Sequence, residues 1–510
     1  MRKQFFCQIL GLIKIVLVIV VGFSIAGHGF VEKNLEDRRE KHAVKSIQSE
    51  DGDVIDCIDI YKQKAFDHPV LQGHIIQMKP NDDPTEQTMT AAKTKTWKER
   101  NDQSSMAVTS QIWKKSGSCP EGTIPVRRIR NPGAFQSNSG EVYGRKKPSF
   151  NEHPNLQQPN HSVWFTYPIA IVITEGYHYS GVKADIKVWN PFVESDDEYS
   201  TSRVLLACGP YYDFESVESG WTVNPSVYGD RQTRLYAYWT VDASKTTGCF
   251  DLTCPGFVQT STEIALGAAI YPISVTNGLQ YQIIIYIYKD PITSNWWVQY
   301  GENINIGYWP HDLVGALRTG ASTAEWGGEV YSSKLGQPPH TATAMGNGRF
   351  ADYVFADSGC MKRMRIRDNS PNLKSPEWVS TYADEYNCYD SAILITVGHN
   401  YFGAQGDINL WNSAVDLPDD YTTAQIWLKA GPADNFESVE AGWVVNPKLY
   451  GDRTTRLTRL FAYWTDNKTG HRWLKCGDDA VIGYWPTEMF EYLSHSATSV
   501  EWGGEVTAKM

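Results

Sequence analysis

The sequence lacks the short motifs that mark several large enzyme classes. It contains no GxSxG, no HExxH and no Walker A sequence, so a serine hydrolase with a nucleophile elbow, a zincin and a P-loop enzyme are poorly supported. An excess of positive charge is also absent, because 47 Lys and Arg face 58 Asp and Glu, a net charge of −11. A protein that follows nucleic-acid phosphates should be basic. We therefore expect no nucleic-acid partner.

Long apolar runs are missing everywhere except at the N-terminus. A basic start is followed by an apolar stretch from about Ile9 to Ile25, interrupted by Lys14, and Ser24-Ile25-Ala26 offers small residues to a signal peptidase. This pattern predicts a cleaved secretory signal over residues 1–26. An uncleaved anchor helix is disfavoured by Lys14 and by a run shorter than the ~20 residues of a membrane span. We expect a secreted, extracellular protein, with the cell wall and the vacuole as candidate locations, and no membrane contact after signal removal.

A histidine cluster at zinc-ligand spacing is also lacking, so we expect no metal. Nine cysteines, eight after loss of Cys7 with the signal, fit an oxidising compartment. Sequence alone cannot fix their connectivity. The candidate bridges are Cys249 with Cys254, Cys57 with Cys119, and Cys360 with Cys388. Sequons at Asn160 and Asn467 predict glycosylation of a secreted chain.

The residues present in excess indicate β-structure. The chain has 18 Trp, 28 Tyr and 18 Phe, with 41 Gly and 25 Pro, the composition of strands and tight turns. From about residue 162, apolar runs of strand length recur between turn residues, several with period two. The runs are Ile169–Thr174, Ala184–Trp189, Arg234–Trp239, Tyr281–Tyr288 and Trp296–Tyr300. We predict an all-β protein built around an antiparallel β-sandwich, with one short helix over 310–319.

The C-terminal part of the chain repeats the middle part. FESVESGWTVNPSVYGDR (214–231) recurs as FESVEAGWVVNPKLYGDR (436–453), and IGYWP and EWGGEV recur at 482–486 and 501–506. The copy is incomplete: Glu218 and Glu329 are 111 residues apart, whereas Glu440 and Glu505 are 65 apart. Material matching roughly 241–293 is missing. Since a sandwich without central strands exposes its edges and core, we predict that residues 391–510 are not an independent active unit.

Two carboxylates in the repeated motifs are candidates for chemistry. Glu218 lies in SVESGW and Glu329 in EWGGEV. In a strand, Glu325, Gly327 and Glu329 would share one face, and Gly327 would leave open space between two acids for a substrate backbone. Glutamate is rarely buried without a partner. On residue type alone, an exposed strand glutamate is the simpler interpretation.

A series of segments, in order along the chain, carries a family resemblance. They are VIDCIDIYKQKAFDHPVL (54–71), GTIPVRR (122–128), VESGW, TGCFDLTCPGFVQT (247–260), NWWVQYG (295–301), GYWP, EWGGEV and HTATAMGNGRF (340–350). The first two resemble the activation peptide of the neprosin family, and the others resemble its catalytic domain. The resemblance covers about residues 50–390 plus the partial repeat. We divide the chain into a signal (1–26), a pro-segment (27–155), a catalytic β-sandwich (156–390) and an incomplete second copy (391–510).

The resemblance implies a secreted glutamic endopeptidase that is made as a zymogen and cuts beside proline, without metal or organic cofactor. Carried over by motif, the catalytic residues are Glu218 and Glu329 on the concave face of the sandwich. Glu325 is the residue most easily confused with the second. The resemblance also implies that the Cys249–Cys254 bridge lies in the catalytic domain. The partners would be proline-containing polypeptides and the chain's own pro-segment, acting as an intramolecular inhibitor.

Two carboxyl groups that face one water cannot both ionise easily, so they would share a proton. The ionised acid would take a proton from the attacking water while the protonated acid polarises the peptide carbonyl. This chemistry predicts an acidic optimum. Cleavage of the pro-segment is expected in the linker near 145–161, after protonation of the carboxylates that pair with Arg127, Arg128 and Arg130.

A slot with aromatic walls could hold the compact ring of proline. Most aromatic residues of a sandwich belong to its core, so we expect two or three at most to line a cleft. The candidates are Trp221, Trp239, Trp296, Trp297, Tyr308, Trp309 and Trp326, of which we select Trp221, Tyr308, Trp309 and Trp326.

Two other functions remain open. A glycosidase also uses two carboxylates, and aromatic surfaces stack on sugar rings. A catalytically inactive neprosin-like protein of the cell wall, or one that binds carbohydrate, would keep the fold without the activity. The truncated copy and the divergent strand around Cys208 make this second possibility the main alternative.

Overall fold

The computed structural model describes residues 43–82, 107–129, 143–147, 169–383 and 394–507. Within these ranges it has gaps at 211, 335–339, 349–357, 369, 371, 407, 409–420, 432–436, 446–461, 466–471 and 477–479. The predicted signal, both sequons and residues 148–161 of the predicted linker lie outside the described residues. No helix in the described part is long and apolar enough to cross a membrane.

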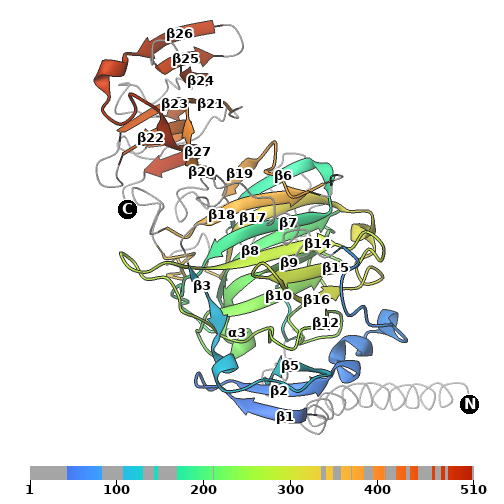
Figure 1. Ribbon diagram of the computed structural model, residues 1–510. Helices are drawn as coiled ribbons and strands as arrows, with labels where there is room; N and C mark the ends of the chain where they lie inside the picture. Colours follow the sequence, from blue (N-terminus) through green and yellow to red (C-terminus); the bar gives the residue numbers. More distant parts are fainter. Residues whose placement is uncertain are drawn as a thin grey trace, which may run out of the picture.

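Two seven-stranded sheets form the centre of the protein (Figure 1). The first, here the front sheet, has the order β11-β10-β9-β8-β17-β6-β19, and every neighbouring pair is antiparallel. Its strands are β6 (Ile169–Tyr179), β8 (Tyr199–Cys208), β9 (Glu215–Val223), β10 (Arg234–Thr240), β11 (Cys249–Phe250), β17 (Ala321–Tyr331) and β19 (Ser380–Ala383).

The second sheet, here the back sheet, has the order β12-β16-β15-β14-β7-β18, and β3 pairs with β14 in parallel. Its strands are β3 (Ala107–Val108), β7 (Gly181–Lys187), β12 (Val258–Gln259), β14 (Tyr281–Lys289), β15 (Trp296–Tyr300), β16 (Ile304–Trp309) and β18 (Met361–Arg367). The five runs predicted to be strands are all strands, because their alternation places one apolar face on a shared core.

The core lies between the two sheets. Val217 and Trp221 from β9 and Trp326 from β17 meet Ile285 and Trp296 of the back sheet in one hydrophobic cluster. The residues that alternate with these apolar side chains along β9 and β17 therefore point away from the core. An antiparallel β-sandwich is thus the fold, as predicted.

The N-terminal region adds a small sheet below the sandwich in Figure 1. It consists of β1 (Ala43–Gln48), β2 (Val54–Asp59) and β5 (Thr123–Arg127). Ile58, Ile60 and Ile124 of this region join the main core, and β4 (Ser110–Gln111) pairs with β13 (Ile270–Tyr271). Short 3-10 turns complete it: η1 (Ile60–Lys62), η2 (Lys64–Asp67), η3 (Pro69–Leu71) and η5 (Ile112–Lys115).

Helix is scarce in the described residues. The one-turn helix α3 (Pro225–Tyr228) begins after Asn224, whose side chain accepts from the Val227 N–H, and ends at Gly229 with φ +76°. The helix predicted over 310–319 is wrong: only the 3-10 turn η7 (Ala316–Arg318) forms there. A single turn of apolar residues does not offset the cost of helix nucleation.

The C-terminal copy forms two four-stranded sheets with orders β20-β27-β22-β23 and β21-β24-β25-β26. Their strands are β20 (Leu394–Tyr401), β21 (Gly403–Ala404), β22 (Tyr421–Ala430), β23 (Glu437–Val445), β24 (Ala462–Thr465), β25 (Arg472–Cys476), β26 (Ala480–Trp485) and β27 (Ala497–Thr507), with the 3-10 turn η9 (Thr487–Met489). They enclose a separate small core that includes Ile426, Leu428 and Val500.

The internal deletion moves one strand from one sheet to the other. By sequence, β24 (AYWT) matches residues 237–240 of β10, which pairs with β9 in the front sheet. In the copy, β24 instead lies between β21 and β25, the place that β14 takes in the complete sandwich. The strand that carries Glu440 therefore has no counterpart of β10 beside it among the described strands.

Candidate active site

Glu218 and Glu329 lie on the face of the front sheet that is turned away from the core. β8 separates their strands, and its register places Glu218 opposite Leu205 and Glu329 opposite Thr201. Both glutamates are buried, with 2% and 6% of their surface exposed. Buried carboxylates need partners, and each has several.

Glu218 is held by one hydroxyl and two cations. The Tyr236 hydroxyl donates to its Oε1 at 2.9 Å, and Lys146 Nζ lies 2.6 Å from the same oxygen. Arg203 Nε lies 3.2 Å from Oε2. Burial, together with the neighbouring glutamate, raises the pKa of Tyr236 well above its usual value. The phenol therefore stays protonated and donates.

Glu329 has a matching set of partners. The Tyr199 hydroxyl donates to its Oε1 at 2.7 Å, Lys146 Nζ lies 2.9 Å from Oε2, and Arg203 Nε lies 3.7 Å from Oε2. Burial opposes ionisation, but the charges of Lys146 and Arg203 outweigh it and lower the pKa of Glu329. One ammonium group thus bridges two carboxylates.

Glu325 pairs with Arg203, whereas Lys146 contacts Glu218 and Glu329. Its carboxylate accepts from Arg203 Nη1 at 3.0 Å, and burial raises its pKa despite that ion pair. Gly327, between the two acids, does not leave the open space predicted from the sequence. A Cβ at Gly327 would lie 2.1 Å from the Ala170 carbonyl oxygen, so glycine is needed there for close approach of β6.

Lys146 belongs to a short stretch, Tyr143–Lys147, here called the docked segment. Its backbone is tied to the sandwich by the Phe250 N–H, which donates to the Gly144 carbonyl at 2.7 Å, and by the Lys146 N–H, which donates to Tyr238 at 3.2 Å. A Cβ at Gly144, where φ is +79°, would lie 2.2 Å from Thr253 Oγ1. The docked segment thus fits closely enough to place one ammonium group between the two glutamates.

Two family profiles match the chain. The profile described as Neprosin matches residues 196–403, 418–468 and 458–510, and the profile described as Neprosin activation peptide matches residues 46–180. The chain belongs to the neprosin family. It is accordingly a peptidase-family protein with an activation peptide. Both glutamates fall in the first neprosin match, and Lys146 falls in the activation peptide.

Solved glutamic-peptidase structures show a weak likeness. Scytalido-glutamic peptidase with a peptide-based transition-state analogue is 11% identical with a TM-score of 0.24. SCP-B, a member of the Eqolisin family in complex with the tripeptide Ala-Ile-His, is 10% identical with a TM-score of 0.23. Each alignment covers 46% of this chain and 94% of the other. At these scores the likeness carries no argument about the site.

The aromatic residues selected for a proline slot lie elsewhere in the neprosin domain. Trp221, Trp309 and Trp326 are fully buried in the core between the sheets, because they alternate with the outward-facing residues of their strands. Tyr308 packs on the back sheet beside Ala65 and Leu71 of the activation peptide. The prediction that these four line a cleft with the glutamates is therefore wrong. The aromatic side chains beside the pair are Tyr199, Tyr236 and Tyr238.

Two of the three proposed disulfides are present. Cys57–Cys119 closes the activation peptide, and Cys249–Cys254 closes the loop after β11 in the neprosin domain. The third is not formed, because Cys360 is a free cysteine, as is Cys208. Cys388 lies outside the described residues. In the part of the chain that is described, no cluster of three His, Cys, Asp or Glu has metal-binding geometry.

Arg127 and Arg128 of the activation peptide pair with acids of the peptide itself. Arg127 binds Asp53 at 2.9 Å and Arg128 binds Asp56 at 2.7 Å, while Arg130 lies outside the described residues. One ion pair that crosses to the neprosin domain is Asp53 with Arg234, at 2.6 Å and fully buried. Asp82 with Arg367 and Lys114 with Glu263 also cross, and Arg127 donates to the Tyr228 carbonyl at 2.8 Å. From the sequence, we expected the carboxylates paired with Arg127 and Arg128 to hold the activation peptide on the catalytic domain. In the structure these carboxylates belong to the activation peptide itself.

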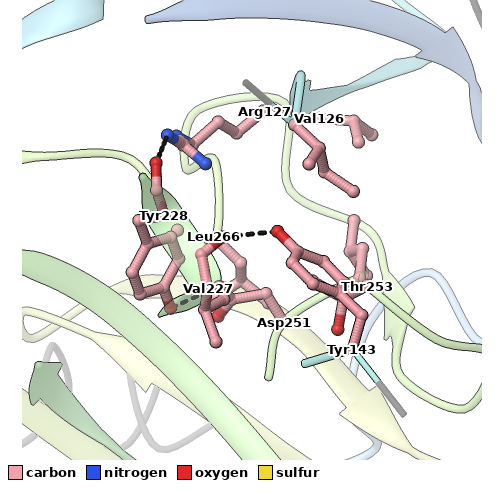
Figure 2. A pocket seen from close by; sticks show the side chains of 11 residues that line it. Val126, Arg127, Tyr143, Val227, Tyr228, Asp251, Thr253 and Leu266 are labelled. Atoms are coloured by element: carbon pink, nitrogen blue, oxygen red, sulfur yellow. Dashed lines mark hydrogen bonds between the residues drawn. The ribbon is translucent and has the colours of Figure 1, made fainter. Parts of the chain in front are cut away.

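A small pocket opens beside this contact, between the activation peptide and the neprosin domain (Figure 2). Arg127 and Tyr143 of the activation peptide line it together with Tyr228 and Asp251 of the neprosin domain. The Tyr228 hydroxyl donates to Asp251 at 2.7 Å. Burial raises the pKa of Asp251 to about 7. The sequence offered one signal for this acid, its position between the two cysteines of CFDLTC.

The second copy keeps the acids but changes their surroundings. Gln425 faces Gly442 and Gly503 across its neighbouring strands, as Arg203 faces Gly220 and Gly327 in the first copy. Its amide donates to Glu440 Oε2 at 2.8 Å, and Glu440 is exposed. Among the described residues, Glu440 is neither buried nor beside a counterpart of β10, so its environment differs from that of Glu218.

Proposed function

We propose that the chain is the latent precursor of a glutamic endopeptidase that uses Glu218 and Glu329 to activate water. The observation that carries this proposal is the shared ammonium group: Lys146 Nζ lies within 2.9 Å of a carboxylate oxygen of each glutamate. Two acids that contact one atom are close enough to share a proton once that atom leaves. In this proposal the precursor is secreted, and its pro-segment is cleaved before the peptidase becomes active.

In the processed site a water would replace the ammonium group. The ionised glutamate accepts a proton from this water, which attacks the peptide carbonyl. The protonated glutamate donates a hydrogen bond to the carbonyl oxygen and later supplies a proton to the leaving nitrogen. Tyr199 holds Glu329 Oε1 and leaves Oε2 for the water, whereas Tyr236 holds Glu218 Oε1, the oxygen that itself faces the water. The pair works only when singly protonated, which gives an acidic optimum.

Preference for proline is the finer part of the proposal, and it rests on the family resemblance. Tyr238 lies under Lys146, with the Nζ 5.1 Å from the ring centroid. Lys147 lies over Tyr331 at the same distance. These ring faces, rather than the tryptophans of the core, are the apolar surfaces beside the glutamates that a proline ring could contact when the docked segment has left.

The test is cleavage of a proline-containing reporter peptide beside the same peptide with alanine. The chain from Ala26 onward is secreted, acidified and assayed. We expect proline-dependent cleavage in the wild type and a loss of at least about a thousandfold in Glu218→Gln and in Glu329→Gln, because the shared-proton state no longer exists. Glu440→Gln, at the matching position of the second copy, is the control and should keep full activity.

The alternatives give different results. Release of reducing sugar from polysaccharide without new amines would indicate a glycosidase. A folded and processed chain that cleaves nothing at any pH would favour the non-catalytic protein. A fully active Glu218→Gln variant would exclude the two-glutamate assignment.

A further inference from the structure

Arg203 is placed among three carboxylates by the register of β8. It faces Gly220 on β9 and Gly327 on β17, so neither direct cross-strand neighbour has a side chain. Diagonal neighbours on paired strands are within reach of a long side chain. Those neighbours are Glu218, Glu325 and Glu329, and the guanidinium contacts all three within 3.7 Å.

The charge of this site changes when the docked segment departs. In the precursor, Lys146 and Arg203 are the cations paired with the three glutamates among the described residues. Lys146 leaves with the activation peptide. Arg203, with 5% of its side chain exposed, stays in the sheet. One guanidinium is then paired with three carboxylates. The Tyr236 and Tyr199 hydroxyls, which donate to Glu218 and Glu329, remain beside them.

The Nε–H of Arg203 is a hydrogen-bond donor that is not satisfied while the docked segment is in place. It is buried and has no aligned hydrogen-bond acceptor, although it lies 3.2 Å from Glu218 and 3.7 Å from Glu329. A buried N–H without an acceptor costs free energy. When the ammonium group leaves, a small shift of either carboxylate would satisfy it.

The second copy shows the same frame without this charge. Gln425 takes the position of Arg203 between two glycines and binds Glu440. Among the described residues of this copy, Lys429 pairs with Glu501, the counterpart of Glu325, at 2.6 Å. The sheet therefore accepts glutamine at this position, and the arginine is not required merely to build it.

We propose that Arg203 is a positioning residue that keeps one of Glu218 and Glu329 ionised at acidic pH after Lys146 has left. It does so by directing its Nε–H at the gap between the two carboxylates while Nη1 anchors on Glu325. The inference rests on the proposed function, and it adds the group that keeps the base of the pair charged.

The sign of the effect follows from electrostatics. An adjacent guanidinium typically lowers a carboxyl pKa by about 1–3 units. With the docked segment in place, burial raises the pKa of Glu325, whereas the two cations lower that of Glu329. Protonation of Glu325 as the pH falls would leave the guanidinium to the pair. Without Arg203 the base would be protonated at higher pH.

The experiment compares Arg203→Gln and Arg203→Lys with the wild type after processing. The readout is kcat and KM for the reporter peptide from pH 2 to 7. In Arg203→Gln we expect the acid limb of the kcat profile, where kcat falls as the base is protonated, to move to higher pH by about 1 unit or more. At pH values below the shifted limb, kcat should be about tenfold lower than in the wild type, with little change in KM. Arg203→Lys keeps the charge, so its acid limb should stay close to that of the wild type.

Several results would overturn the proposal. They are an unshifted acid limb in Arg203→Gln, a loss of kcat that is uniform with pH, and an Arg203→Lys limb displaced as far as that of Arg203→Gln. If Arg203→Gln is not secreted, Arg203→Lys decides, since a displaced limb in that variant refutes the role of the charge.

A second readout separates this proposal from the proposed function. Glutamate carboxyl groups labelled with ¹³C are titrated by NMR in the processed wild type and in each variant. If the wild type cleaves nothing, the proposed function fails, but the carboxyl titrations still differ if Arg203 sets the ionisation of the pair. Identical titrations in wild type and Arg203→Gln would overturn the inference even where cleavage is observed.

Discussion

Lys146 is the side chain on which we expect latency to depend most. Its ammonium group lies where the attacking water would have to bind, 2.6 and 2.9 Å from the two glutamates. Replacement by methionine, Lys146→Met, keeps the length but leaves two buried carboxylates without this cation. Loss of one partner from a buried ion pair typically costs about 3–5 kcal/mol. The precursor should therefore process at a pH at least about one unit higher than the wild type, measured by gel and reporter cleavage.

Arg145→Met is the matched control for this change. Arg145 is the adjacent residue of the docked segment, but its guanidinium donates to the Thr246 carbonyl at 2.6 Å, outside the glutamate pair. Its loss should leave the activation pH within a few tenths of a unit. Equal latency of Lys146→Met and wild type would show that the docked segment inhibits by covering the site rather than by charge.

The chemistry of single residues was only partly readable from the sequence. The glutamates were assigned through the family resemblance of their motifs, whereas residue type alone favoured exposed strand glutamates. Lys146 and Arg203 were not assigned, because their partners lie far away in sequence: Lys146 meets Glu329 across 183 positions. A basic residue in a polar pro-segment looks like any solvated charge. The one signal for Arg203 was its position inside the apolar strand that runs through VLLAC.

The loop closed by Cys249–Cys254 carries a buried acid with an unusual titration. Asp251 accepts from the Tyr228 hydroxyl at 2.7 Å and from the Ala237 N–H at 3.1 Å. Burial raises its pKa from 3.8 to about 7, so the folded state binds this proton more tightly than the unfolded state. The stability it contributes is complete below about pH 4 and is lost as the pH rises toward 7.

Asp251→Asn should remove that pH dependence. Asparagine is isosteric with the protonated acid and can still accept from the Ala237 N–H. We expect the variant to be more stable than the wild type at pH 8, by a few kcal/mol at most, and about equal at pH 4. Thermal unfolding at the two pH values measures this. A variant that is less stable at pH 8 would contradict the assignment.

Strand positions followed from the sequence, but strand partners did not. Alternation located the five predicted strands, since period two reports which face is buried. The deletion in the second copy was also visible. The relocation of β24 was not, because AYWT fits either sheet and its place depends on which strands remain to pair with.

The predicted aromatic slot failed because of side-chain alternation. Trp221 and Trp326 are three positions from the glutamates of their strands, and this odd spacing puts each tryptophan on the opposite face from its glutamate.

The activation peptide is built into the protein at several separate places. Ile58, Ile60 and Ile124 lie in the main core, Leu71 packs on Tyr308, and Asp53 pairs with Arg234. The docked segment adds the contact at the glutamates. Release of the peptide therefore has to break apolar contacts and ion pairs together, and acid acts only on the ion pairs.

Asp53 is one group through which acid should weaken this attachment. Burial raises its pKa, but the charges of Arg234 and Arg127 outweigh burial and lower it below 3.8. A depressed pKa contributes stability that is present above the ordinary pKa and is lost as the pH falls through the depressed value. The ion pair with Arg234 thus persists at neutral pH and yields only in strong acid, below about pH 4.

Asp53→Asn removes that charge at every pH, so the precursor should be less stable at neutral pH by about 3–5 kcal/mol and should process at higher pH than the wild type. Asp56→Asn is the matched control from the same strand region, because Asp56 pairs with Arg128 inside the activation peptide and Arg128 is one-third exposed. We expect it to cost less than Asp53→Asn, because its partner is partly exposed, and to leave the activation pH unchanged. Thermal unfolding and processing from pH 2 to 7 give both quantities. If the two variants behave alike, the attachment depends on the fold of the activation peptide itself and not on the ion pair that crosses to Arg234.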